Sequence, residues 1–231
     1  MQKSWKANLQ SWWRGWGYSI LVALLIATSF KSAIADWNDV PTGSMTPTIL
    51  AGDRIFVNKL AYDLKVPYTT LHLARWGNPS RGDIVVFYSP ENGKRLVKRV
   101  VGLPGDILAM DRNRLIINGK PLAYALIDAQ VLEFRDSDLL ANHRIASENL
   151  AGHKHAVMFT PKMPSRHSFR PVRIPEGHYF MMGDNRDNSA DSRYFGLVSR
   201  RDIVGQAMRV VISWEGSILH PRTERFFKKL I

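Results

Sequence analysis

Hydrophobic and polar positions divide the chain into an apolar N-terminal stretch and a longer part made of short alternating runs. Residues 15–30 carry no charge, and together with residues 31–35 they form a segment of 21 residues. As a helix such a segment is roughly 31 Å long, enough to cross the hydrocarbon core of a bilayer. The pattern therefore predicts one N-terminal transmembrane helix over residues 15–35.

The charges before this segment predict its orientation. Lys3, Lys6 and Arg14 precede it without any acidic residue. By the positive-inside rule, residues 1–14 are expected in the cytoplasm and everything after Ala35 outside it. A cleavable signal peptide is the alternative, because residues 33–35 (Ala-Ile-Ala) match the small-x-small pattern of a cleavage site. A buried helix of a soluble domain is a weaker alternative.

Beyond residue 40 the pattern changes to short apolar runs separated by Gly, Pro, Asn and Asp. Residues 84–88, 96–101 and 208–213 are predicted strands, and residues 115–117 run into Asn118-Gly119, which favours a tight hairpin. Residues 49–62 are ambiguous. A sustained helical period is rare, so we expect a mainly β domain with little helix beyond the anchor.

Residues 107–175 differ from their surroundings and indicate an inserted, smaller β-rich subdomain. They contain an acid-bearing polar stretch (128–148) and a basic stretch with prolines (154–173). The expected organisation is a cytoplasmic N-terminus (1–14), a transmembrane anchor (15–35), a catalytic core in two parts (36–106 and 176–231) and the insertion between them (107–175).

Net charge and composition narrow the range of molecules that this protein is expected to bind. The formal net charge of +12 favours anionic surfaces, but the basic residues are spread along the chain without a compact basic helix. A solvated basic surface accounts for part of this charge, and a phospholipid membrane is a better expected partner than nucleic acid. The chain has no cysteine, which excludes disulfides and thiolate chemistry.

Ser44 is a candidate nucleophile, because it lies between glycine and an apolar residue in a proline-flanked stretch (41–48). A serine nucleophile needs a base, most often histidine. None of the seven histidines lies in a motif with a well-placed acid. His153 and His155 have no third ligand at useful spacing, so we interpret them as exposed loop residues and expect no metal.

Lysine is the other candidate base, provided that apolar neighbours lower its pKa from about 10.4. Lys98 interrupts an apolar run, and strand alternation puts it on the face of Leu96 and Val100. The alternative is a solvent-facing lysine on an amphipathic strand. A third segment, residues 183–196, concentrates acids, amides and arginines. It is either a polar loop with internal ion pairs or a scaffold that holds polar groups beside the base.

Four segments in order resemble the signature boxes of bacterial type I signal peptidases. They are PTGSMTPT (41–48), RGDIVVF (81–87), KRVVGLPGD (98–106) and GDNRDNSADSRYFG (183–196). The resemblance covers most of residues 38–106 and 176–214. It implies the Ser–Lys protease β fold of signal peptidases and the activity of a membrane-bound serine endopeptidase, without cofactor or metal.

The resemblance also implies roles for individual residues. Ser44 is the nucleophile and Lys98 the general base, oriented by Ser189. The Ser44 N–H and the Thr42 hydroxyl form the oxyanion hole, where the family more often has serine in place of Thr42. The implied scaffold comprises Gly183, Asp184, Asn185, Arg99, Asp191 and Arg193, and the implied substrate-binding residues are Val40, Pro41, Met45, Ile49, Leu96 and Val97.

The implied substrate is a secretory preprotein, cut after a small-x-small site as its extended chain adds to strands near residues 39–42 and 96–98. The implied location is the bacterial inner membrane, single-pass, with the catalytic domain on the periplasmic side. Well-known Gram-negative members have two spans where this chain has room for one. The main alternative is therefore a specialised maturation peptidase of a conjugation or secretion system with a narrow substrate set.

Three further hypotheses stay open. Residues 33–35 resemble the family's own cut site, which suggests self-processing after Ala35; an intact N-terminus on protein purified from membranes would contradict it. A soluble self-cleaving Ser–Lys repressor needs an N-terminal DNA-binding domain, which residues 1–35 do not resemble. A catalytically dead protein that holds export substrates is disfavoured by the joint presence of Ser44, Lys98 and Ser189. The sequence does not predict an oligomeric state.

Overall fold

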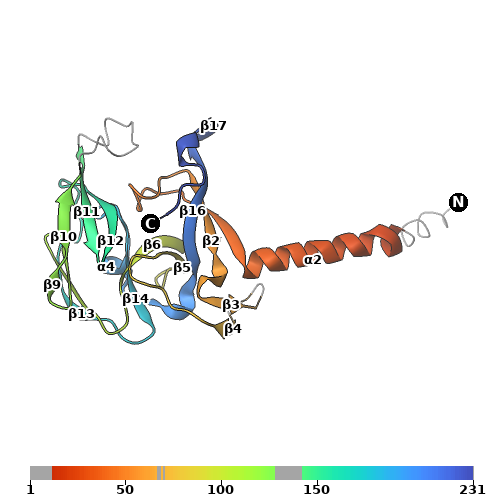
Figure 1. Ribbon diagram of the computed structural model, residues 1–231, viewed down its shortest axis with the longest axis horizontal. Helices are drawn as coiled ribbons and strands as arrows, with labels where there is room; N and C mark the ends of the chain where they lie inside the picture. The colour runs from red at the N-terminus through yellow and green to blue at the C-terminus, as the bar shows by residue number, and fades with distance from the viewer. Residues whose placement is uncertain (1–11, 67–68, 70, 128–141, 231) are drawn as a thin grey trace.

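The computed structural model describes residues 12–66, 69, 71–127 and 142–230. The predicted cytoplasmic residues 1–11 and the predicted polar residues 128–141 lie outside the described residues. A long N-terminal helix projects from a body built mainly of antiparallel strands (Figure 1). The mainly β fold predicted from the sequence is confirmed.

The projecting helix begins with a π-helical turn, η1 (Trp13–Gly17), which continues directly into α2 (Tyr18–Ala33). Apolar side chains of α2 such as Leu21, Leu24 and Leu25 are exposed. None of the helices in the described part of the chain meets the length and hydropathy required of a membrane span. Ile34 alone separates α2 from β1 (Ala35–Asp39), so the helix enters the sheet without a linker.

Eight strands form the largest sheet, and every pair in it is antiparallel. Along the sheet they are β1, β2 (Asp53–Asn58), β16 (Ile203–Glu215), β5 (Ile84–Tyr88), β6 (Arg95–Gly102), β14 (His178–Met182) and β15 (Val198–Ser199), and β17 (Ser217–Pro221) pairs with β16. This order places β6 between β5 and β14, although β14 follows it in the chain by some 80 residues. Strands from both segments of the predicted core, residues 36–106 and 176–231, are therefore joined in one sheet.

The predicted strands of this sheet are found in it. Residues 84–88 form β5, residues 96–101 lie within β6, and residues 208–213 lie within β16. The ambiguous residues 49–62 contain β2 and a short 3₁₀ turn, η2 (Lys59–Ala61). β5 is buried at four of its five positions because apolar clusters cover both of its faces.

The strands between residues 107 and 173 pair with one another in two smaller sheets, and a bridge from Met158 of β12 to Asn185 links them to the loop after β14. One has the order β13 (Phe169–Arg173), β7 (Ile107–Asp111), β8 (Arg114–Ile117) and β9 (Lys120–Pro121), and the other has β10 (Ala123–Leu126), β11 (Arg144–Leu150) and β12 (His153–Phe159). The hairpin predicted at Asn118-Gly119 joins β8 to β9. Both residues have positive φ, 52° and 78°, as a tight hairpin turn requires.

The remaining elements are short. A two-stranded sheet of β3 (Asp63–Lys65) and β4 (His72–Arg75) lies near the base of α2 (Figure 1). One helical turn, α4 (Ser192–Phe195), follows β14, and 3₁₀ turns occur at η4 (Arg200–Asp202) and η5 (Thr223–Arg225). In the described part of the chain little helix is found beyond the N-terminal one, as the sequence predicts.

Three apolar clusters form the core. The first includes Ile55, Val57, Ile84, Val86 and Val210; the second includes Leu108, Leu115, Leu150, Ile174 and Phe180; the third includes Val85, Phe87, Val100, Met181 and Val198. The second cluster joins the smaller sheets to β14. The first and third cover opposite faces of the β5–β6 pair, so a polar side chain on β6 is held in apolar surroundings.

Candidate active site

Ser44 lies in the loop between β1 and β2. The loop is fixed by its apolar neighbours, because Met45 and Ile49 are 1% and 0% exposed and pack in the first cluster. At its base the Val40 N–H donates to the Asp53 carbonyl oxygen at 2.8 Å. This anchoring holds Ser44 half-buried in one place.

Lys98 on β6 points its amine at Ser44. Its Nζ donates to Ser44 Oγ at 2.6 Å and to the Val97 carbonyl oxygen at 3.0 Å. The residue is only 3% exposed. Burial lowers the pKa of Lys98 to about 8, although the negative charges of Asp191 and Asp184 oppose this shift. About a tenth of Lys98 amines is therefore neutral at pH 7, far more than for a lysine with its usual pKa. Because Lys98 is buried, the solvent-facing alternative is wrong.

Gly183 lets residues 183–196 approach the Ser44 loop. A Cβ atom at Gly183 would lie 2.4 Å from the Ser44 carbonyl oxygen and 2.3 Å from Ser189 Oγ, so no larger residue fits here. Asn185 holds the two segments together, since its N–H donates to the Ser44 carbonyl oxygen and its side-chain amide to the Gly43 carbonyl oxygen, each at 3.1 Å. Ser189 is thereby brought to the site. Its buried hydroxyl has no hydrogen-bond partner among the described residues.

A buried ion pair lies beside this contact. Arg99 donates to both carboxylate oxygens of Asp184, at 2.8 and 2.7 Å, and each side chain is 1% exposed. Thr48 donates a further hydrogen bond to Asp184 at 2.5 Å. Burial raises the pKa of Asp184, but the charge and hydrogen bonds of Arg99 outweigh it and hold that pKa below its usual value. Asp184 is therefore a structural anion.

A second buried pair, Asp191 and Arg193, shapes the same loop. Asp191 caps α4 and accepts from the Gly183 N–H at 3.1 Å, while Arg193 donates to it at 2.8 Å. Both side chains are fully buried. The pair ties the start of residues 183–196 to their end.

The sequence analysis missed a charged cluster between the smaller sheets and this loop. Glu148 on β11 is completely buried and accepts two hydrogen bonds from Arg186, at 2.7 and 2.6 Å. His155 Nε2 lies 3.3 Å from Glu148 and 3.8 Å from Asp184. The interpretation of His155 as an exposed loop residue is wrong, because it lies on β12 and is 7% exposed; His153 is exposed as expected but also lies on β12, not in a loop.

The predicted substrate-binding residues lie at different depths. Val40, Met45 and Ile49 belong to the first core cluster and are at most 5% exposed. Val97 is half-buried against that cluster, and Leu96 is half-buried on the opposite face, against the third. Pro41 and Thr42 are exposed. Only Pro41, Leu96 and Val97 of the six predicted residues have appreciable surface.

Comparison with known proteins identifies the family. The family model described as "Signal peptidase, peptidase S26" matches residues 13–214. The chain belongs to this family. The family prediction is therefore confirmed, together with the enzyme class, a serine endopeptidase of the signal peptidase I type.

Relatives with this name come from distant bacteria. A "Signal peptidase I" of Pseudomonas aeruginosa is 38% identical over 214 residues, which cover 86% of this chain and 72% of the relative. A "Signal peptidase I P" of Bacillus subtilis subsp. natto is 34% identical over 205 residues, covering 88% and 89%. A crystal structure of a signal peptidase I from Enterococcus faecalis V583 is 32% identical and covers 56% of this chain and 96% of its own, with a TM-score of 0.34.

Proposed function

We propose that this signal peptidase cleaves secretory preproteins with Ser44 as nucleophile and Lys98 as general base. The observation that carries the proposal is the 2.6 Å contact between Lys98 Nζ and Ser44 Oγ, made by a lysine that is 3% exposed. A nucleophile and a base at hydrogen-bond distance are the minimum that serine catalysis requires. The other printed contact of the Lys98 amine is the neutral Val97 carbonyl oxygen, so no carboxylate is hydrogen-bonded to this amine among the described residues.

The catalytic cycle follows from this pair. Neutral Lys98 takes the Ser44 proton as Ser44 Oγ attacks the scissile carbonyl carbon. The Ser44 N–H and the Thr42 hydroxyl stabilise the oxyanion that forms. The Lys98 ammonium then protonates the leaving amine, and the C–N bond breaks to give an ester on Ser44. Water, deprotonated by Lys98, hydrolyses the ester and restores Ser44. The buried Ser189 hydroxyl, which has no hydrogen-bond partner among the described residues, is free to accept from the Lys98 amine during the cycle and so to orient it.

The substrate adds as an extended strand beside β1 and β6. β14 pairs with β6 only at Arg99, Val100 and Gly102, so the edge of Leu96 and Val97 on that side has no strand partner among the described residues. β1 is the outermost strand of the sheet. Two free edges near Ser44 support β-augmentation by the preprotein. Met45, Ile49 and Val40 then support the small-residue pockets from beneath.

Cleavage of a preprotein with an Ala-x-Ala site tests the proposal. The wild-type chain in detergent is expected to cut after the second alanine, and Ser44→Ala to lose the activity to background while it stays folded by circular dichroism. Retained cleavage by Ser44→Ala would remove Ser44 from the mechanism. If wild type cuts no general preprotein but does cut a single dedicated one, the narrow-substrate alternative replaces general processing.

The activity is expected to depend on pH through Lys98. Only the neutral amine accepts the Ser44 proton, so kcat/KM should rise with pH and level off above a pKa of about 8. Below that value the neutral fraction, and with it kcat/KM, falls about tenfold per pH unit. A profile of kcat/KM against pH checks this. A flat profile, or a rise centred at the usual lysine pKa, would contradict the assigned base.

Residues 15–35 act as a single-pass membrane tether, with residues 1–14 in the cytoplasm and the catalytic part on the periplasmic side. The exposed apolar side chains of α2 and its projection from the body support this (Figure 1). The full chain is expected to float with liposomes after an alkaline wash, and a chain lacking residues 1–33 to stay in the soluble fraction. Equal release of both chains would rule out the tether.

The domain boundaries are also a proposal. Residues 36–106 and 176–231 form the catalytic core, and residues 107–175 are an insertion in it. The pairing of the strands between residues 107 and 173 with one another, apart from the Met158–Asn185 bridge, supports these bounds.

A further inference from the structure

A cavity of about 330 Å³ opens among the smaller sheets, and neither Ser44 nor Lys98 lines it. Its wall comes from the β7–β8 turn, from β10, β11 and β12, and from the loop after β12. Asp187, from residues 183–196, also contributes. The volume is at the lower end of the range of binding sites for small ligands, and it holds one or two side chains of a bound segment.

Three arginines line this cavity. Arg112 has a loose pair with Asp111 at 3.6 Å, in which the two side chains are 89% and 63% exposed. Arg114 and Arg144 are exposed, and neither forms an ion pair with a described residue. Three guanidinium groups around one cavity repel each other, and an anion bound between them relieves that repulsion.

The acidic residue in the wall does not balance these arginines. Asp187 has a completely buried side chain that accepts hydrogen bonds from Asn113 at 2.9 Å, from the Thr160 N–H at 2.8 Å and from Ser165 at 2.7 Å. These hydrogen bonds fix the carboxylate but leave its negative charge. Three arginines against one aspartate still give the described lining a net positive charge.

The rest of the wall is suited to an apolar side chain. The rings of Tyr124 and Phe159 lie 6.4 Å apart, and Leu126 is 85% exposed. Apolar surface of this kind accommodates an aromatic or aliphatic side chain.

We propose that this cavity binds an acidic peptide segment that carries an aromatic or aliphatic side chain. The carboxylates pair with Arg114 and Arg144, and the apolar side chain contacts Tyr124 and Phe159. Arginine is suited to this role because its planar fork binds a carboxylate through two hydrogen bonds.

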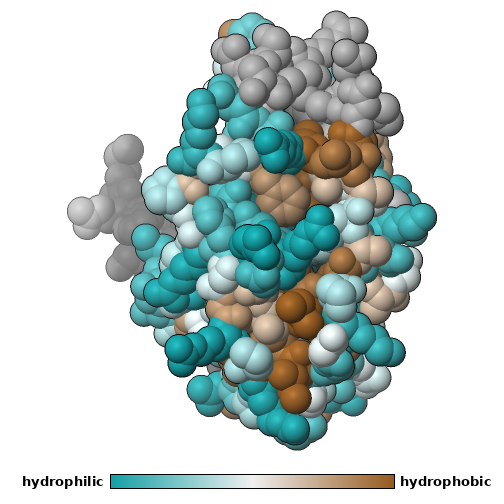
Figure 2. All heavy atoms as spheres, turned by 90° about the vertical axis from the view of Figure 1, so that its left-hand side faces the viewer, coloured by the Kyte–Doolittle hydropathy of each residue, from teal (hydrophilic) through white to brown (hydrophobic). Residues whose placement is uncertain are grey.

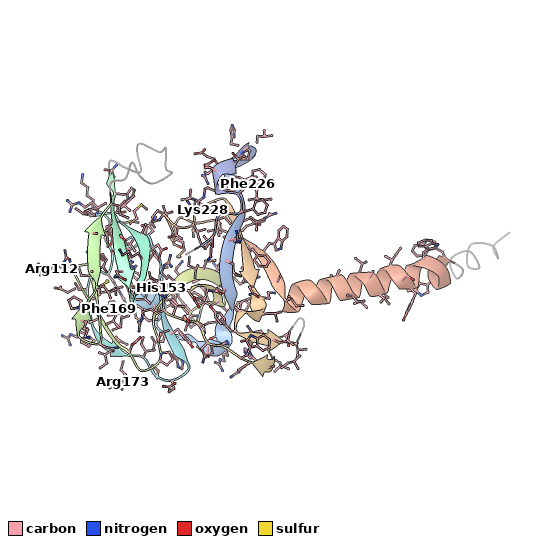
Figure 3. The ribbon with its side chains drawn as sticks, in the orientation of Figure 1. Arg112, His153, Phe169, Arg173, Phe226 and Lys228 are labelled. Atoms are coloured by element: carbon pink, nitrogen blue, oxygen red, sulfur yellow. The ribbon has the colours of Figure 1, made fainter. Side chains whose placement is uncertain are left out.

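The position of the cavity favours a peptide over a lipid headgroup. Arg112 lies at the end of the molecule opposite α2 (Figure 3). Figure 2 shows that end, where hydrophilic side chains lie beside apolar ones. A bilayer that holds α2 lies at the other end, so this step rests on the proposed tether.

Binding of a labelled acidic peptide to the full wild-type chain tests the proposal. The probe is acetyl-Asp-Phe-Glu-Leu-Asp-amide, which lacks a small-x-small site, with a version carrying lysine at the acidic positions as its control. Fluorescence anisotropy is expected to show saturable, salt-sensitive binding of the acidic peptide alone. The double variant Arg114→Glu, Arg144→Glu should weaken it roughly tenfold or more. The matched variant Arg170→Glu, Arg173→Glu, on exposed positions of β13 outside the cavity, should bind as wild type.

Three outcomes would overturn the proposal. They are no saturable binding to the wild-type chain, equal binding of the acidic and basic peptides, and unchanged affinity in a folded Arg114→Glu, Arg144→Glu variant. Binding of the same proteins to phosphatidylglycerol vesicles is measured separately. If the double variant loses vesicle binding and keeps peptide binding, the cavity is a lipid site. Peptide binding requires no cleavage, so failure of the Ser44–Lys98 mechanism would leave these measurements unchanged.

Discussion

Replacing Lys98 with alanine is expected to lower kcat for preprotein cleavage by about 10⁴-fold or more. The variant loses the amine 2.6 Å from Ser44 Oγ, and no histidine or carboxylate is hydrogen-bonded to Ser44 among the described residues. The loss should appear in kcat more than in KM, because the amine moves a proton and does not hold the substrate. Single-turnover cleavage of a preprotein measures it.

A matched control separates loss of the base from loss of a buried lysine. Lys65 is half-buried, and burial lowers its pKa as it does that of Lys98, but its amine donates to the Ile203 carbonyl oxygen at 2.6 Å. Lys65→Ala is expected to keep the wild-type kcat. Similar activity of Lys98→Ala and Lys65→Ala would show that Lys98 is not the base.

Changing Asp184 to asparagine is expected to lower the free energy of unfolding by about 3–5 kcal/mol. The change leaves the Arg99 guanidinium, which is 1% exposed, without a counter-charge. Chemical unfolding followed by circular dichroism gives the value, with an unchanged m-value as evidence that the same structure unfolds.

The control for this prediction is a surface pair of the same type. Asp39 and Arg54 are hydrogen-bonded at 2.5 and 3.1 Å, with side chains 72% and 41% exposed. Asp39→Asn is expected to cost less than about 1 kcal/mol because solvent screens the pair. If Asp184→Asn costs no more than Asp39→Asn, the buried pair does not hold the loop.

Local patterns in the sequence were sufficient for much of the fold, and they named Ser44 and Lys98 as candidates, which the family resemblance then joined as a pair. Alternation and turn residues predicted β5, β6 and the hairpin at Asn118-Gly119, because strand pleat and tight turns depend on neighbouring residues. Lys98 could be chosen over the histidines because it alone interrupts an apolar run. The resemblance then added Ser189, whose position depends on the close approach at Gly183.

The cluster around Glu148 could not be predicted with the same means. Alternation along β11 puts Glu148 on the face of Ala146 and Leu150, and all three are buried. This alternation was overlooked because residues 128–148 were interpreted together as one polar stretch. Its partner Arg186 lies 38 residues further along the chain, and such a pairing depends on the tertiary fold.

How deeply each predicted substrate-binding residue is buried could not be predicted from the sequence, for a different reason. An apolar residue beside a nucleophile either lines a substrate pocket or anchors the loop in the core, and the same residue types serve both roles. Met45 and Ile49 anchor the loop in the core, while Leu96 and Val97 retain surface.

The contact between β12 and residues 183–196 limits which segments of this protein can be replaced, by recombination, with those of a relative. The Met158 N–H donates to the Asp184 carbonyl oxygen and the Arg186 N–H to the Met158 carbonyl oxygen, each at 2.8 Å. Arg186 also forms a buried ion pair with Glu148 of β11. A chimera that received residues 107–175 from a relative without an acid at position 148 would bury an unpaired guanidinium. Insertion and loop are therefore expected to be inherited together.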